Sequence, residues 1–422
     1  MSRTRYARFA LSCFVAFACS LCAYSLSVDR WYSLGRGEST CVTEVRDKDG
    51  EKCGSWLTDY TKMHSLAAKK LKAGKPVQLL VYSCQSGCGG LGDRLSGMLS
   101  AFFVAVSTQR VFVIDHANPF PLRDTLLPNS IDWDLAAFVQ ASFDSTTVHL
   151  IDTSDPMVSF GSIMKAHLTG VTVVRVQLNR YFVAMALWTP RTLLQVPSGE
   201  EFAFVGRLYE SHVRFCSDVP RTKSTFKIAF HHLFRFAGAV LTRSEGMYKE
   251  LEFNSSSKYI GLHARLGGRV EGSGQVLEWE DPTRHGMGDL PIFLNCAKSK
   301  NFGRWGIRGV VMPLLVISDS SEFKEASERI SGATYVKSTM LFHIDRSIAT
   351  NTTLLAQGNI DTYAELLLLS RATCIVGSHS GFSGVAAAIS DENEPRCFCM
   401  FDDCSNEDFD FFESTERSQV RF

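Results

Sequence analysis

The sequence predicts an α/β protein with two Rossmann-like domains, and three observations support this prediction. Short β-branched apolar runs alternate with helical segments from about residue 77, as in a parallel sheet covered by helices. The alternation starts again near Lys227. A chain of 422 residues, 45% of them hydrophobic, has enough apolar side chains for two such domains.

The first block begins with the apolar run Val77–Tyr82, which predicts a buried strand. The glycine-rich stretch GCGGLGDRLSG follows, then an apolar helical segment over 95–106 and a second strand over Arg110–Asp115. This order of strand, loop, helix and strand is typical of a doubly wound sheet. The apolar region 148–186 predicts further strands and helices without clear bounds.

The second block begins with KIAFHHLFRFAGAVL, which predicts one helix before the strand KYIGLHARL over 258–266. Further predicted elements are a strand over 309–319, a helix from Ser321, a helix over 360–372 and a strand from Cys374. Each alternates with the next, so the block predicts a second parallel sheet.

The N-terminus carries Arg3, Arg5 and Arg8 before an apolar run from Phe9 to about Val28. Such a run is long enough for a cleaved signal or for one membrane-spanning helix. The basic N-terminal flank favours a type II anchor with its N-terminus in the cytoplasm. Secretion after cleavage and a mitochondrial presequence are the alternatives.

Ten cysteines follow the apolar run, an even number that suits disulfides in an oxidising compartment. Sequons at Asn254 and Asn351 agree with a secretory route. A zinc site at Cys397, Cys399 and Cys404 is disfavoured by the spacing and by the lack of a nearby histidine. Lys plus Arg and Asp plus Glu number 44 each, so no bulk positive field favours nucleic acid.

The glycine-rich loop has several interpretations. Gly87, Gly89 and Gly92 satisfy G-x-G-x-x-G, and Asp115 ends the next strand, as in a dinucleotide-binding oxidoreductase that uses NAD. Asp93 disfavours that interpretation, because its carboxylate would lie near the helix amides that receive a pyrophosphate. The glycines also suit a tight turn with no ligand.

His263 and Arg265 end the first strand of the second block, two residues apart and therefore on one face of it. A guanidinium at the carboxyl end of a parallel strand is placed to hold a phosphate in bidentate fashion. The alternative is a buried arginine paired with a carboxylate beside a core histidine.

Three ordered motifs, GGLGDRLSG, GLHARLGG and IDTYAELLLLSRATCIVGSHSGFSGVAAAIS, resemble those of the GDP-fucose-dependent fucosyltransferases. That superfamily includes the alpha-1,2, alpha-1,6, plant xyloglucan and protein O-fucosyltransferases. The resemblance spans about residues 77–390. It implies a GT-B-like fold whose two domains face a cleft, with GDP-fucose as co-substrate, a glycan acceptor, and no metal or other cofactor.

The chain divides into four predicted parts. The basic flank and apolar run predict a cytoplasmic tail and anchor over 1–30, and the polar composition without clear period predicts a stem over 31–75. For the two α/β blocks, the resemblance implies an acceptor-side domain over 76–225 and a GDP-fucose-binding domain over 226–422. Together with the apolar run, it places the protein in the Golgi membrane.

The resemblance assigns donor-binding roles residue by residue. His263 and Arg265 match the H-x-R-x-G motif, whose arginine holds the diphosphate. The loop before the first helix and the turn after the last strand supply the other matches: Gly90, Gly92, Asp93, Arg94, Ser380, Phe382 and Ser383. Leu266 and Gly268 replace an arginine and an acid of many members, which leaves the acceptor linkage open.

Fucose transfer requires charge stabilisation on the departing GDP and a base for the acceptor hydroxyl. Arg265 supplies the first. The base is expected in the glycine-rich loop after Gly268, where Glu271 is our first choice among four acids, the others being Glu278, Glu280 and Asp281. The loop is long enough to close over a substrate, although all four acids also suit a solvated surface.

Three further acidic features have two interpretations each. Asp319 ends a strand and suits either a ribose or guanine contact or a helix cap. Asp345 suits either a guanine contact or an internal ion pair. Asp132 and Asp134 form a D-x-D string, the manganese signature of another glycosyltransferase fold, but are interpreted as a capping and solvent-facing pair.

Two competing functions stay open. One is a non-catalytic protein of the same fold that binds glycans or nucleotide sugars, and the other is the NAD-dependent oxidoreductase.

Overall fold

The structure is a computed structural model. It describes residues 55–84, 88–151, 162, 163, 166, 169–179, 221–253, 256–267, 269–272, 275–278, 285–302, 312–337, 352–378, 380–390 and 397–400. The predicted anchor, the asparagines of both sequons, Gly87, Glu280, Asp281 and Asp345 lie outside these residues. In the described part, no helix combines the length and apolar character needed to cross a bilayer.

The first sheet has four parallel strands in the order β2-β1-β5-β4. They are β1 (Leu79–Ser83), β2 (Val111–Asp115), β4 (Ser145–Leu150) and β5 (Val173–Leu178). Alternate residues of β1 face opposite layers, because strand side chains alternate. Leu80 and Tyr82 pack in the core that contains helix α3 (Leu91–Thr108), whereas Leu79 and Val81 pack with α2 (Ser55–Lys72).

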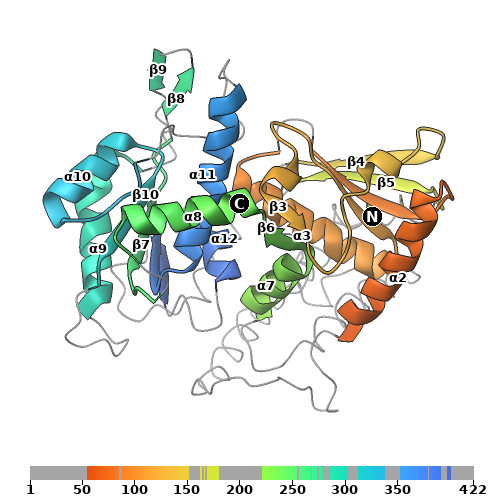
Figure 1. Cartoon of the computed structure of the whole chain (residues 1–422), viewed down its shortest axis with the longest axis horizontal. Coiled ribbons are helices and arrows are strands. Elements are labelled where there is room, and N and C mark those ends of the chain that lie inside the picture. Colours follow the sequence, from red (N-terminus) through yellow and green to blue (C-terminus); the bar gives the residue numbers. More distant parts are fainter. Residues whose placement is uncertain are drawn as a thin grey trace, which may run out of the picture. The chain divides into compact units, whose positions relative to one another are not determined.

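Helix α2 corrects the prediction that residues 31–75 form a stem (Figure 1). The Tyr60 hydroxyl donates to the Arg110 carbonyl over 2.8 Å and accepts from the Phe112 amide over 3.1 Å. The His64 ring lies 2.9 Å from the Phe112 carbonyl. These contacts cover the unpaired edge of β2, which would otherwise be open to pairing with another chain. Only the part of 31–75 before Ser55 stays a predicted stem.

The segment predicted as one helix before the second sheet is two helices with a short strand between them. Helix α7 (Arg221–Leu233) leads into β6 (Phe234–Phe236), and α8 (Gly238–Glu250) follows. Strand β6 pairs antiparallel with β3 (Leu126–Pro128) of the first half. The predicted domain boundary at 225/226 falls inside α7. The chain after this boundary still contributes strand β6 to the first half.

The second sheet is also parallel, with the order β10-β7-β11-β12. Its strands are β7 (Ile260–Ala264), β10 (Leu314–Ser318), β11 (Cys374–Gly377) and β12 (Cys397–Met400). One face packs with α9 (Leu290–Phe302) and α10 (Ser321–Ser331) (Figure 1). The other face packs with α11 (Thr352–Ser370). The strand order reverses between β7 and β11, the place where open α/β sheets bind ligands.

Both sheets contribute to one hydrophobic core. The largest buried cluster includes Leu80 and Phe112 of the first sheet and Ile375 and Phe398 of the second. Helix α12 (Gly381–Ile389) connects them, since it contacts α11, α3 and α7. The described residues, from Ser55 onward, accordingly belong to one compact unit.

The remaining elements are short. They are a β8–β9 hairpin (Arg269–Gly272 and Gln275–Glu278) and three 3-10 turns, η1 (Leu122–Asp124), η2 (Ala136–Phe138) and η3 (Met287–Asp289).

Candidate active site

The carboxyl edges of the two sheets meet where α3 and α12 begin. Helix α3 follows β1 and helix α12 follows β11, so each helix begins at the carboxyl end of a central strand. A Cβ atom added to Gly92 would lie 2.2 Å from the carbonyl carbon of Gly381. Only glycine permits backbones to approach so closely. Gly92, which the sequence placed in a donor-binding loop, therefore lies at a close backbone contact between the two halves.

Arg265 lies directly after β7, at the reversal point of the second sheet. Its guanidinium pairs with Asp319 over 3.0 Å, and the two side chains are 13% and 15% exposed. The same carboxylate accepts from the Leu266 amide over 2.8 Å and from the Gly267 amide over 3.3 Å. The Ser378 hydroxyl, after β11, accepts from the Arg265 amide over 3.0 Å. Asp319 and Ser378 thus fix both the backbone and the side chain of Arg265.

This arrangement shows that Asp319 is not the cap of α10, and its ribose or guanine contact stays a prediction. The cap of α10 is Ser320, whose hydroxyl accepts from the Phe323 amide. Asp319 instead holds the segment 265–267. Sequence reasoning missed Ser378, which follows the predicted strand from Cys374. Its role depends on the strand register: β7 and β11 are parallel with His263 beside Gly377, so the residue after Gly377 lies beside the end of β7.

His263 connects β7 to α12. It is 6% exposed, and its Nδ1 lies 2.6 Å from the Ser383 hydroxyl oxygen. The Phe382 ring lies against the imidazole with ring centroids 4.9 Å apart. The Ser380 hydroxyl accepts from the Phe382 amide over 3.3 Å and caps α12. The structure therefore brings together five predicted donor-site residues, namely His263, Arg265, Ser380, Phe382 and Ser383.

The turn after β1 is held by its own side chains. A disulfide joins Cys84 to Cys88, and the Asp93 carboxylate accepts from the Gly90 amide over 2.9 Å. The Arg94 side chain, 3% exposed, donates to the Gly89 carbonyl over 3.0 Å and to the Asn118 carbonyl over 2.9 Å. Asp93 thus occupies the amide end of α3, where a bound pyrophosphate would have to lie.

Arg94 also donates to His116, whose Nε2 lies 3.0 Å from the guanidinium. Burial, aided by the charge of Arg94, lowers the pKa of His116 to about 4. The ring is therefore neutral near pH 7, with Nε2 as the acceptor. Arg94 and His116 support the turn from inside.

Of the other predicted acids, Glu280, Asp281 and Asp345 lie outside the described residues, and the D-x-D aspartates lie in the first half of the chain. The D-x-D aspartates form ion pairs, Asp132 with Lys72 over 2.7 Å and Asp134 with Arg123 over 4.0 Å, on either side of the buried Trp133. Among the side chains the structure describes, no group of three or more acidic, histidine or cysteine residues could hold a metal ion.

The glycine-rich segment after Gly268 was predicted as a loop, and much of it is instead the β8–β9 hairpin. Glu271 lies on β8, in register with Val276 of β9, and Glu278 lies in register with Arg269. The local sequence explains the hairpin, because RVEG and QVLE are separated by Ser-Gly, a pair typical of turns.

No protein-family model and no curated protein matches the chain, but solved structures do. A point mutant of Arabidopsis thaliana FUT1 in complex with GDP has a TM-score of 0.51 and 17% identity, covering 79% of this chain and 76% of that one. The alpha-1,6-fucosyltransferase NodZ of Bradyrhizobium, soaked with GDP-fucose, has a TM-score of 0.43 and 13% identity, covering 74% of this chain and 93% of that one. The apo form of POFUT1 has a TM-score of 0.37 and 10% identity, covering 78% of this chain and 98% of that one. The chain therefore shares the parallel-sheet α/β fold of the FUT1 structure, which has the one TM-score above 0.5 among these three, as the motifs predicted.

Proposed function

We propose that the chain is a glycosyltransferase that moves L-fucose from GDP-fucose to a hydroxyl group of a glycan acceptor, with inversion and without a metal ion. One observation carries the proposal. Arg265 lies at the reversal point of a parallel sheet, held there by Asp319 and Ser378. A guanidinium is suited to bind a diphosphate. It has five N–H donors, so some can bind the carboxylate that orients it while the remaining donors face phosphate oxygens.

In this proposal the diphosphate lies between Arg265 and the start of α12, a nine-residue helix from Gly381. The amides of a helix N-terminus favour an anion. The Phe382 ring and His263 close that side of the site, with Ser380 and Ser383 at the helix start. Asp345 stays a proposed guanine contact.

The reaction needs one displacement. The acceptor hydroxyl oxygen attacks the anomeric carbon of fucose while the bond from that carbon to the diphosphate oxygen breaks. The electron pair of that bond goes to the diphosphate, where Arg265 stabilises the charge. The hydroxyl proton goes to a carboxylate, and Glu271 on β8 is the proposed base. A single displacement inverts the anomeric carbon, so GDP-β-L-fucose gives an α-fucoside.

Metal independence is supported by the D-x-D string, because each of its aspartates already faces a cation of the chain, Lys72 or Arg123. The proposed location is the Golgi membrane, with a type II anchor over 1–30 that depends on the sequence alone.

The test is a GDP-release assay on the full chain with GDP-fucose, GDP-mannose and UDP-galactose, each with and without EDTA. We expect release from GDP-fucose alone, unaffected by the chelator. Arg265→Ala should lower the rate roughly 100-fold or more, because it removes charge stabilisation from the leaving group.

The matched control is Arg175→Ala, which breaks the partly exposed ion pair of Arg175 with Asp115 in the first sheet and should leave GDP release unchanged. GDP binding without release on a panel of glycan acceptors would favour the non-catalytic function. A chain that binds no GDP would contradict the proposal.

A further inference from the structure

A lysine is buried in the first turn of α10, four residues after the cap Ser320. The Lys324 amide donates to the Ser320 carbonyl over 3.2 Å, the first turn of the helix, and the residue is 3% exposed. A cation at a helix N-terminus opposes the helix dipole, and burying it carries a further cost. Helix stability therefore does not explain Lys324.

The counter-charge comes from another helix. Lys324 Nζ lies 3.6 Å from a carboxylate oxygen of Glu365 on α11, and the two side chains are 4% and 15% exposed. Burial raises the pKa of Glu365, and the charge of Lys324 opposes that shift. The pair therefore joins the start of α10 to the middle of α11.

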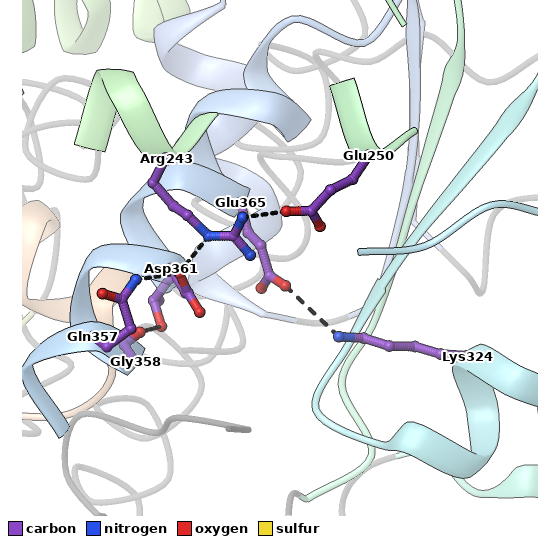
Figure 2. Close-up of polar contacts among 8 residues, drawn as sticks. Arg243, Glu250, Lys324, Gln357, Gly358, Asp361 and Glu365 are labelled. Carbon is purple, nitrogen blue, oxygen red and sulfur yellow. Dashed lines mark hydrogen bonds and ion pairs between the residues drawn. The ribbon is translucent and has the colours of Figure 1, made fainter. Parts of the chain in front are cut away.

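Helix α11 is itself fixed by a second set of polar contacts, which Figure 2 shows beside the first. Arg243 of α8 donates to Asp361 over 2.7 Å and to Glu250 over 2.6 Å. Gln357 also donates to Asp361, over 2.9 Å. Asp361 precedes Glu365 by one helical turn, so α11 presents one polar face that binds α8 and α10.

The start of α10 sets the position of Asp319, which together with Arg265 forms what we call the diphosphate clamp. Asp319 immediately precedes the cap Ser320, and it is Asp319 that holds the guanidinium and the amides of 266 and 267. A shift of the first turn of α10 would carry Asp319 with it. Buried ion pairs often add little stability compared with apolar residues, but their geometry is directional.

We propose that Lys324 and Glu365 are positioning residues for the diphosphate clamp: their ion pair fixes the start of α10 and thereby holds Asp319 and Arg265 in register. This inference rests on the proposed function, because it assigns the pair to the same donor site. The pair itself does not touch the donor.

The test is GDP affinity, measured by calorimetry on the full chain, together with thermal unfolding. Lys324→Met should weaken GDP binding on the order of ten-fold, because a misplaced group in a binding site loses much of its effect. The double variant K324M/E365M removes both charges and keeps similar volume, so it should fold normally and still bind GDP weakly. Lys72→Met is the control, since it breaks an ion pair in the first half.

A double-mutant cycle separates positioning from a purely structural role. Combined with Arg265→Lys, Lys324→Met should cause little further loss of GDP affinity if it acts through the clamp. An equal loss in both backgrounds, or wild-type affinity in K324M/E365M, would overturn the inference while leaving the proposed function standing. A wild-type chain that binds no GDP would overturn both.

Discussion

Two polar clusters lie at the carboxyl ends of the central strands, and they differ in what their arginines contact. After β1, Arg94 is 3% exposed and donates to two backbone carbonyls and to His116. After β7, the Arg265 side chain is 13% exposed and pairs with one carboxylate. The first arginine stabilises a turn, whereas the second is oriented at a sheet edge. An arginine near the end of a parallel strand thus supports a turn in one half, whereas in the other half it is the residue that we propose binds the diphosphate.

The largest effect should come from Gly92→Ala, which acts where the two clusters meet. The added Cβ would lie 2.2 Å from the backbone of Gly381, and backbone cannot rotate away as a side chain can. We expect a loss of about 4 kcal/mol in the free energy of unfolding, measured by urea denaturation.

Gly384→Ala in α12 is the matched control, because its Cβ would meet nothing within 4 Å. It should be neutral or stabilising by up to about 1 kcal/mol. Equal stability of the two variants would contradict the close approach at Gly92.

Arg94→Met and Arg265→Met should differ in whether they affect stability or GDP binding. The first change leaves the carbonyls of Gly89 and Asn118 without this donor in a buried environment, so unfolding should become easier by about 3 kcal/mol. Arg265→Met should lower GDP affinity with a smaller effect on unfolding. The comparison fails if Arg94→Met is as stable as the wild type.

His116 should make the first cluster sensitive to acid. Its pKa falls from 6.5 to about 4 in the folded chain, mainly through burial. Between these two pH values, His116 binds a proton more readily in the unfolded chain than in the folded chain. The free energy of unfolding therefore decreases as the pH falls below 6.5. From pH 7 to pH 5 the contribution lost is about 2 kcal/mol.

The measurement is urea denaturation of wild type and His116→Gln across this pH range. The glutamine variant should show a flatter pH dependence. His149→Gln, which changes an exposed ring bonded to Gln177, should keep the wild-type slope, and a wild-type slope in His116→Gln would exclude the assigned cause.

The smallest effect should come from Asp132→Asn. Its ion pair with Lys72 is nearly half exposed on both sides, and such pairs contribute about 0.2–1 kcal/mol. GDP release should stay at the wild-type rate, with or without manganese. A loss of activity that manganese modulates would show that the D-x-D string belongs to the catalytic centre.

Much of the strand pattern could be predicted, because buried parallel strands have a continuous apolar signal. The strands at 111–115, 260–264 and 374–377 lie within the predicted runs, and the strand at 79–83 extends one residue beyond its run of 77–82. Helix α2 was missed because it covers a sheet edge and exposes much of its surface to solvent. The break between α7 and α8 was missed because β6 pairs with a strand more than a hundred residues earlier.

The sequence by itself determined which residue types lie at the ends of the strands: Arg265 after one strand, glycines after another, and Ser380 at a helix start. These are local features, set by periodicity and capping. Tertiary structure decided that Asp319 and Ser378 hold Arg265, that Arg94 faces inward, and that Gly92 meets Gly381. Each of these is a contact between segments that are distant in the chain. The distance between the contacting residues depends on how helices and sheets pack, and no local sequence pattern encodes that packing.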